Sequence, residues 1–394
     1  MSQKRRIQQI ITKDLNKKMV LLAGPRQCGK TTLALNLLKK IPGTYYNWDD
    51  DEHKELIRKG NLEQKFPLWV FDEIHKYSRW RNWLKGKYDL YHHKHKILVT
   101  GSAKLDLYHR GGDSLQGRYY LHRLHPFSFS ELQGCKIAET LDEMMSMDIK
   151  SKNDTDLGDL LEYSGFPEPL LSGSATEAKR WRTTYGYRLI REDVSSLENI
   201  ILVDKIQDLY DHLPSTVGSP LSINSLREDL ELNFRTVSNW IEIFDRNYAS
   251  FRVPPFGAPK IKAVKKEQKL YLWDWARIEN ISYRFENLIA LHLLRMCHWF
   301  LDLYGEEYEL RYFRDTEKRE VDFIISKKKK ALVAIEVKES QQELDNNLKY
   351  FLERVPVKYA FQVHLKGTLH KRLPDINGAQ VWLIPATRFL ANLP

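Results

Sequence analysis

Residues 24–31 read Gly-Pro-Arg-Gln-Cys-Gly-Lys-Thr, a complete G-x-x-x-x-G-K-T pattern. The apolar run Met19–Ala23 precedes it, and a helix-compatible run from Thr32 to Lys40 follows it. A chain of phosphates needs backbone N–H groups that point inward, a lysine for its β- and γ-oxygens and a hydroxyl for Mg²⁺. The pattern supplies all three groups and lies between a predicted strand and a predicted helix. The alternative, an ordinary glycine-rich turn, would require neither the strand nor the helix. It therefore predicts a nucleoside triphosphate site.

The chemistry of this site is expected to come from two segments. The predicted phosphate loop consists of Gly24, Pro25, Arg26, Gln27, Cys28, Gly29, Lys30, Thr31 and Thr32. The second segment is the apolar run 68–71, which ends in Asp72 and Glu73. Asp72 and Thr31 are expected to hold Mg²⁺, and Glu73 to polarise the attacking water. The alternative is a buried strand followed by two surface acids. ATP and Mg²⁺ are the expected cofactors.

Two further apolar runs complete the predicted nucleotide-binding core. Residues 96–102 form a buried strand whose exit brings Ser102, or alternatively Thr100, beside the γ-phosphate as a sensor. Residues 44–48 form another strand, and residues 49–52 after it are expected to be a solvated loop. Strands that alternate with helices predict a parallel α/β sheet covered on both faces.

The order of these motifs carries a family resemblance. The segments are GPRQCGKT, LWVFDEIHK, VTGSAKL, SLQGR at 114–118 and LHPFSFSE at 124–131. Together they resemble the AAA+ ATPases, in particular a bacterial and archaeal group in which such a module precedes an uncharacterised C-terminal region. The resemblance implies an AAA+-type core over 1–135. It also implies that Arg118 reaches the nucleotide of a neighbouring subunit in a homo-oligomer. The alternative is an arginine that anchors the loop to its own domain.

The middle of the chain is expected to be helical and then to resemble a DNA-binding fold. Residues 136–215 are charged and helix-compatible, as expected for a helical lid. A second sensor is expected among Arg180, Arg182, Arg188 and Arg191. Within 216–275, two short helices separated by residues 232–233 and two strands around a basic loop outline a winged helix. Arg235 and Asn239 would then face a DNA groove. The loop lysines Lys260, Lys262, Lys265 and Lys266 would contact phosphates. Winged helices also serve as protein–protein spacers, which is the alternative.

The C-terminal region contains two strands with acids in apolar surroundings. Strands are predicted at 320–326 and 331–338, joined across the four lysines 327–330. Glu336 and Lys338 share one face of their strand. They converge with Asp322 only if the hairpin pairs Asp322 with Glu336 or Ala334. A symmetric four-residue turn would pair Asp322 with Ile335, so convergence requires an odd loop or a bulge.

This pattern resembles the D…E-x-K core of the PD-(D/E)xK nuclease superfamily. The resemblance covers residues 276–394 and implies a C-terminal α/β, restriction-endonuclease-like domain. It implies that Asp322 and Glu336, with Glu286 upstream, ligate Mg²⁺ and that Lys338 positions the water that attacks a phosphodiester. The proline of the superfamily's first motif is replaced here by Glu320-Val321. One alternative is a charged hairpin with a solvated lysine tip. Another is a nuclease-like domain that binds without cutting.

Composition narrows the class of partner. The net charge of +10 and the pI near 9.2 favour a polyanion, expected to be nucleic acid and specifically DNA. Three widely spaced cysteines favour a reducing compartment such as the cytoplasm. The longest apolar region, 288–303, is interrupted by His292, Arg295 and His298, so neither a membrane span nor membrane binding is expected. Two hypotheses remain: an ATP-controlled, metal-dependent nuclease, or an ATP-driven switch or scaffold that does not cleave.

Overall fold

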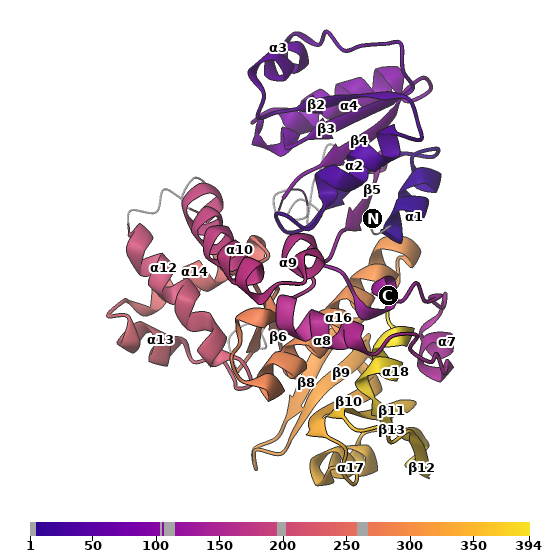
Figure 1. The fold of residues 1–394 in the computed structure, drawn as a ribbon, viewed down its shortest axis with the longest axis vertical. Helices are drawn as coiled ribbons and strands as arrows, with labels where there is room; N and C mark the ends of the chain where they lie inside the picture. Colours follow the sequence, from indigo (N-terminus) through magenta and orange to yellow (C-terminus); the bar gives the residue numbers. More distant parts are fainter. Residues whose placement is uncertain (1–4, 103–104, 106–114, 195–201, 258–266) are drawn as a thin grey trace. The chain divides into compact units, whose positions relative to one another are not determined.

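The computed structural model of this protein describes residues 5–102, 105, 115–194, 202–257 and 267–394. The chain divides into two compact units, Met1–Pro126 and Phe127–Pro394, and each is described by itself (Figure 1). In the part of the chain that the structure describes, no helix has the length and apolarity needed to cross a membrane.

The first unit is built on a five-stranded parallel sheet. Its strands are β1 (Met19–Ala23), β2 (Gly43–Asn47), β3 (Leu68–Asp72), β4 (Lys96–Thr100) and β5 (Tyr119–Arg123), in the order β2-β3-β4-β1-β5. Strands β1 and β3 are buried along their whole length, because helices cover both faces of the sheet. The predicted parallel α/β core is confirmed.

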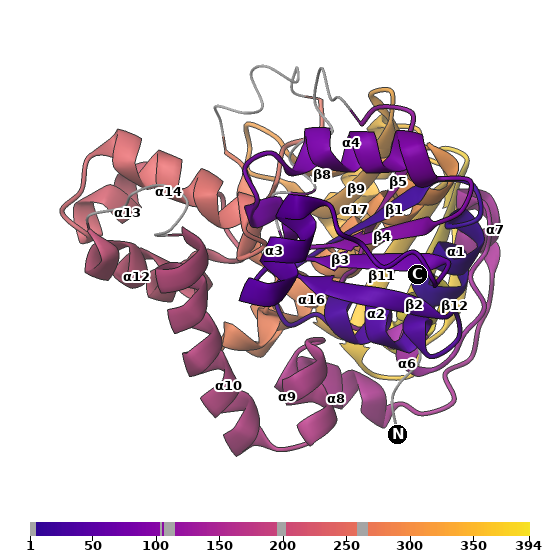
Figure 2. The same cartoon turned by 90° about the horizontal axis from the view of Figure 1, so that it is seen from above.

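Helices cover both faces of this sheet (Figures 1 and 2). They are α1 (Ile7–Asp14), α2 (Lys30–Leu38), α3 (Asp51–Lys59) and α4 (Trp80–Tyr91). Helix α4 buries Trp80 and Leu84 against Trp69, Phe71 and Val99, and α3 contributes Ile57 to the same core. Residues on the alternate positions of the strands point to the other face, where α1 contacts β1 and α2 contacts β3 and β4.

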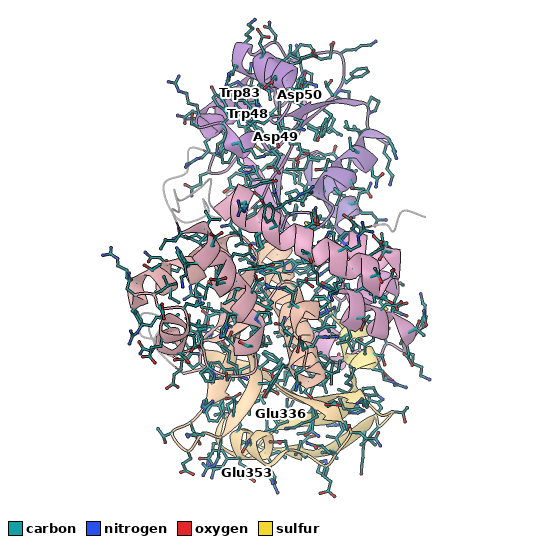
Figure 3. The ribbon with its side chains drawn as sticks, turned by 60° about the vertical axis from the view of Figure 1, so that its left-hand side comes forward. Trp48, Asp49, Asp50, Trp83, Glu336 and Glu353 are labelled. Atoms are coloured by element: carbon teal, nitrogen blue, oxygen red, sulfur yellow. The ribbon has the colours of Figure 1, made fainter. Side chains whose placement is uncertain are left out.

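The prediction of a solvated loop at residues 49–52 is wrong. Asp51 and Glu52 form the first turn of α3, and the Asp50 side chain accepts a hydrogen bond of 2.9 Å from the backbone N–H of His53 (Figure 3). An acidic N-cap followed by acids in the first turn complements the helix dipole. The turn-like composition of this segment therefore marked the start of a helix.

The order of the strands decides which side chains meet. Strand β4 lies between β1 and β3, with Thr100 opposite Leu22 on one side and Asp72 on the other. Because all the strands are parallel, their carboxyl ends lie along one edge. The loop after β1 therefore shares this edge with the last residues of β3 and β4, the usual place for a ligand in an open α/β sheet.

The second unit begins with the helical region that the sequence predicts. Its helices are α6 (Phe129–Leu132), α7 (Leu141–Ser146), α8 (Thr155–Tyr163), α9 (Pro167–Ser172), α10 (Ala175–Arg188), the π-helical turn η2 (Leu189–Val194) and α12 (Val203–His212). Helix α8 contacts the long helix α16 (Ile281–Tyr304), and the Trp275 indole donates to the Leu160 carbonyl. These contacts join the helical region to α16 and to the 3₁₀ turn that precedes it. The predicted borders near 135, 215 and 275, and the lid role, stay predictions.

Two helices and a hairpin follow in the predicted order. Helix α13 (Ile223–Asp229) is capped by Ser222, and α14 (Phe234–Arg246) by Asn233, whose side chain accepts from Thr236 N–H. Strands β6 (Ser250–Val253) and β7 (Lys269–Leu272) pair antiparallel. The winged-helix assignment stays a prediction. The phosphate contacts expected of Lys260, Lys262, Lys265 and Lys266 lie outside the described residues.

The C-terminal part is a mixed six-stranded sheet with helices on both faces. The strands are β8 (Glu309–Arg314), β9 (Glu320–Lys327), β10 (Lys330–Ser340), β11 (Tyr359–Lys366), β12 (Lys371–Ile376) and β13 (Ala379–Pro385), in the order β12-β13-β11-β10-β9-β8. Helix α17 (Asn346–Arg354) packs on Ala334 and Ala360. The adjacent Phe361 points to the opposite face, where it contacts Phe389 of α18 (Ala386–Asn392).

The β9–β10 hairpin contains the irregularity that convergence of its acids requires. Its two-residue loop consists of Lys328 and Lys329, both with positive φ. Next to this loop Ala331 lies opposite Ser326, but one step further Val333 lies opposite Ile325 and Ile335 opposite Phe323. The register therefore shifts by one residue at a bulge. In the shifted register the next pair along the hairpin is Asp322 with Glu336, as the sequence requires for convergence.

Candidate functional sites

The phosphate loop has the backbone that its glycines predict. Gly24 has φ +152°, and a Cβ atom there would lie 2.3 Å from the carbonyl oxygen of Leu124. Gly29 is left-handed and directly precedes α2. The Lys30 ammonium lies inside the loop and donates to the carbonyls of Gly24 and Pro25 at 2.9 and 2.7 Å. The loop therefore curls around the lysine at the N-terminus of a helix, where anions bind favourably.

Hydroxyl groups from neighbouring elements donate hydrogen bonds to Asp72, which lies beside this loop. The residue is 4% exposed, and its carboxylate accepts from Thr31 Oγ1 at 2.7 Å, from Tyr45 Oη at 2.6 Å, and from the Thr100 hydroxyl. The predicted neighbours Thr31 and Asp72 thus lie together. A hydroxyl and a carboxylate beside a phosphate loop are the ligand types that Mg²⁺ takes, so the residues present fit a magnesium nucleotide.

Tyr45 is a site residue that sequence reasoning missed. It lies on β2, two positions before Asn47, which is the residue opposite Asp72. Burial, followed by the hydrogen bond to Asp72 and the charge of Asp72, raises the pKa of the Tyr45 phenol. Tyr45 therefore stays protonated and remains a donor. Only the pairing of β2 with β3 brings it to Asp72, and nothing in the local sequence indicates that pairing.

Glu73 directly follows β3 and has φ +56°. Its carboxylate lies 3.7 Å from His75 Nε2 and 3.4 Å from Lys76 Nζ. Burial raises the pKa of Glu73, while the charges of Lys30 and Lys76 oppose this effect. Ser102 Oγ lies 3.3 Å from the same His75 nitrogen. The two sensor candidates therefore contact different groups: Thr100 donates to Asp72, and Ser102 lies beside His75, which in turn lies beside Glu73. The sensor role of either stays a prediction.

Arg118 makes a bidentate ion pair within the first unit. Its Nε and Nη2 atoms lie 2.7 and 3.1 Å from the two carboxylate oxygens of Asp89 on α4. This is the contact expected of an arginine that anchors the loop to its own domain. A role at the nucleotide of a neighbouring subunit stays a prediction.

The second-sensor and DNA-contact candidates all lie in the second unit. Arg180 pairs with Glu177 on the surface, and Arg188 is also exposed. Arg182 Nε lies 3.5 Å from Asp274 and Arg191 lies 3.8 Å from Asp204. Arg235 and Asn239 are exposed on α14, whose opposite face is buried. The roles predicted for all of these residues stay predictions.

The acids and the lysine of the β9–β10 hairpin converge. Asp322 Oδ2 accepts from the backbone N–H of Val337 at 2.9 Å, and Glu336 Oε2 lies 3.4 Å from the backbone nitrogen of Asp322. Lys338 Nζ lies 2.8 Å from both Glu336 Oε1 and Asp345 Oδ2. Burial is the main cause that raises the pKa of Asp322 and of Glu336, and neighbouring carboxylates add to it. Figure 3 labels Glu336 on this sheet.

A lysine that sequence reasoning placed in a wing strand lies among these acids. Lys269 begins β7 and is 1% exposed. Its Nζ lies 3.1 Å from Glu286 Oε1, 2.5 Å from Glu320 Oε1 and 3.6 Å from Asp322 Oδ1. Glu286 of α16 is thereby linked to the acids of the β9–β10 hairpin. A bound metal ion would link the same groups, but here the link is the Lys269 ammonium. The only signal in the sequence was a lysine directly before the apolar run 270–273.

The acidic cluster does not fit a divalent cation while Lys269 occupies this position. An ammonium and a metal ion cannot share the same oxygens without strong repulsion. Among the residues that the structure describes, no group of three Asp, Glu, His or Cys side chains has the geometry to hold a metal ion. Metal ligation by Glu286, Asp322 and Glu336, and the role of Lys338 beside a metal-bound water, therefore stay predictions.

With the geometry established, comparisons with known proteins define the N-terminal part. Residues 16–133 match the family of AAA domains. The first unit is therefore an AAA-type ATPase domain, and its parallel sheet agrees with the P-loop fold. Residues 154–278 match a domain of unknown function (DUF8612), and residues 284–389 match another (DUF4143).

Similarity to individual proteins is distant. An uncharacterized protein of Methanocaldococcus jannaschii is 25% identical in an alignment of 384 positions, gaps included, that covers 85% of this chain and 78% of that protein. The crystal structure of Bacteroides Pif1 bound to single-stranded DNA matches 32% of this chain and 42% of its own, with 13% identity and a TM-score of 0.20. A signal transduction ATPase with a tetratricopeptide repeat sensor from Pyrococcus horikoshii matches 76% and 47%, with 15% identity and a TM-score of 0.23. This chain spans less than half of each of these two structures.

Proposed function

We propose that the first unit binds ATP with Mg²⁺ and hydrolyses it. The observation that carries the proposal is the hydrogen bond between Thr31, at the start of α2, and Asp72, at the end of β3. It supports a magnesium site beside the loop that holds Lys30. The match to AAA domains agrees with this chemistry.

Each residue of the site has a role in this proposal. Lys30 exchanges the two loop carbonyls for phosphate oxygens, and Thr31 and Asp72 hold the metal. The ion, when bound, neutralises charge that develops on the phosphates. Tyr45 and Thr100 orient the Asp72 carboxylate. Glu73, whose backbone N–H donates to the Thr100 carbonyl, orients the attacking water.

We further propose that the protein acts on or near DNA. Helix α14 buries Val237, Ile241 and Phe244 and exposes Arg235 and Asn239, as a helix that enters a groove does. The net charge of +10 supports a polyanionic partner. Exchanging Arg235 for alanine is expected to weaken DNA binding and to leave ATP hydrolysis without DNA unchanged.

Two functions remain for the C-terminal domain. It is either a metal-dependent nuclease under nucleotide control or a nuclease-like domain that binds without cutting. The position of Lys269 among Glu286, Glu320 and Asp322 supports the second, and we propose that the ATPase drives a switch or scaffold.

The test compares the intact chain with two variants. ATP hydrolysis and cleavage of single- and double-stranded DNA are measured with Mg²⁺ or Mn²⁺, with and without ATP. Lys30→Ala is expected to abolish ATP hydrolysis, because it removes the phosphate contact. No cleavage is expected from the parent. Cleavage that Lys338→Ala removes would instead establish the nuclease, and hydrolysis that persists in Lys30→Ala would contradict the assigned ATP site.

A further inference from the structure

We propose that Lys269 is the resident cation of the acidic cluster, so that the C-terminal domain works without a metal ion and its acids fasten the β6–β7 hairpin. This inference rests on the non-cleaving form of the proposed function and is independent of ATP hydrolysis. It gives the buried carboxylates a role in joining two parts of the second unit.

The backbone of Lys269 is held in place from several sides. Strand β7 pairs with β6, with Val253 opposite Lys269, and Pro220 forms a bridge to Lys269. The Asn287 side chain of α16 closes two hydrogen bonds of 2.7 Å with the backbone N–H and carbonyl of Leu272. Strand β7 is thus attached to α16 by its own backbone. The ammonium reaches the cluster from a fixed position.

The side chains on the same face of β7 reinforce this attachment. Tyr271 lies two residues after Lys269 and therefore points to the same face. Its hydroxyl donates at 2.7 Å to Glu286 Oε1, the oxygen that also contacts Lys269 Nζ. The ammonium lies 5.6 Å from the centroid of the Tyr312 ring, a favourable cation–π position. The ion pair with Glu286, the hydrogen bond from Tyr271 that orients this carboxylate, and the cation–π contact with Tyr312 thus all favour the Lys269 ammonium at this position.

The carboxylates of the cluster all have cations of the chain beside them. Glu286, Glu320 and Asp322 surround Lys269, while Glu336 pairs with Lys338. The other oxygen of Glu320 lies 3.0 Å from Arg314. Asp345 pairs with Lys338. A divalent ion would have to displace Lys269 from oxygens that are buried with it, and a buried charge left without its partner is costly.

Removal of the ammonium should therefore create a site for a divalent cation. The variant Lys269→Met keeps an unbranched apolar side chain and removes the charge. Lys366→Met is the matched control, because Lys366 is an exposed lysine on β11 paired with Glu339 and the same net charge is lost. Binding of MnCl₂ to the full chain is measured by titration calorimetry without nucleotide, and folding is checked by circular dichroism.

The variant Asp322→Asn tests whether the Mn²⁺ binding measured in the titration occurs at the acidic cluster. The parent and Asp322→Asn are expected to bind Mn²⁺ identically. Lys269→Met is expected to gain one Mn²⁺ per chain, bound at least about tenfold tighter than any binding of the parent at this cluster. The gain is expected to disappear in the double variant Lys269→Met/Asp322→Asn and to be absent from Lys366→Met.

Two results would overturn the inference. The first is Mn²⁺ binding by the parent that Asp322→Asn removes, a comparison that decides the matter even where Lys269→Met does not fold. The second is a folded Lys269→Met variant that gains no Mn²⁺. Failure of the proposed function looks different: ATP hydrolysis insensitive to Lys30→Ala, or DNA cleavage sensitive to Lys338→Ala.

Discussion

Tyr45→Phe tests whether the hydroxyl groups on Asp72 position it for catalysis. The substitution removes one donor, the phenol 2.6 Å from Asp72 Oδ2, and leaves Thr31 and Thr100 in place. A hydrogen bond to a charged group contributes about 1.5–3 kcal/mol. Each 1.4 kcal/mol corresponds to about a factor of ten in rate. Full loss of this bond in the transition state would therefore lower kcat/KM for ATP by about 10- to 100-fold.

The matched control is Tyr46→Phe on the same strand. Tyr46 is 2% exposed, and its hydroxyl accepts a hydrogen bond of 2.7 Å from the Glu63 backbone N–H, away from Asp72. Both variants are expected to lose about 1–2 kcal/mol of unfolding free energy, because each removes one hydrogen bond of the folded state. Steady-state hydrolysis is measured per folded molecule. The reasoning is refuted if Tyr45→Phe keeps kcat/KM within about twofold, or if Tyr46→Phe loses as much.

Three further outcomes are expected. Gly24→Ala should abolish ATP binding, measured with a fluorescent nucleotide, because its Cβ would meet a backbone oxygen at 2.3 Å; Gly86→Ala, with open space around its Cβ, is the control and should bind normally. Burial raises the pKa of Glu73, and the role proposed for its carboxylate requires the ionised form, so hydrolysis should fall as pH decreases through a pKa above the usual 4.5. Glu73→Gln should lower kcat by about 10²–10⁴ above this pKa and should no longer show the decrease at low pH, and a parent profile that is flat down to the usual carboxylate range would contradict this role. Lys269→Met should cost about 3–5 kcal/mol of unfolding free energy, because it leaves buried carboxylates without their cation. Its thermal midpoint should fall by roughly 10 °C. Lys366→Met should cost less than about 1 kcal/mol, and an equal cost for the two would show that the buried ammonium is not stabilising.

Local sequence was sufficient where the physical cause is local. The glycines at 24 and 29 are required by the backbone of the phosphate loop itself, and the apolar run that ends at Asp72 is a strand because both of its faces are buried. The same local logic misjudged residues 49–52, since acids that suit a turn also suit the first turn of a helix. The two short helices α13 and α14 were predicted for the same reason, because the caps that start them, Ser222 and Asn233, act within three residues.

From the sequence, the convergence of the C-terminal acids could be predicted only on the condition that the hairpin contains an odd loop or a bulge. Strand alternation determined that Glu336 and Lys338 share a face, and the spacing showed that Asp322 would meet them only with a bulge. The bulge depends on how the whole hairpin packs, since a shift of one residue moves every side chain to the other face of the sheet.

By itself, the sequence determined the elements of the proposed nucleotide site: the loop that holds Lys30, the hydroxyl of Thr31, and the acids Asp72 at the end of β3 and Glu73 directly after it. Tertiary structure alone decided what surrounds these groups. It inserted β4 beside β3, so that Thr100 donates to Asp72, and it paired β2 with β3, so that Tyr45 does the same. It also brought Lys269 to Glu286 and Glu320, which lie 17 and 51 positions further along the chain. The reason is that hydrogen bonds across strands and buried ion pairs join residues whose separation in the chain carries no information about their distance in space.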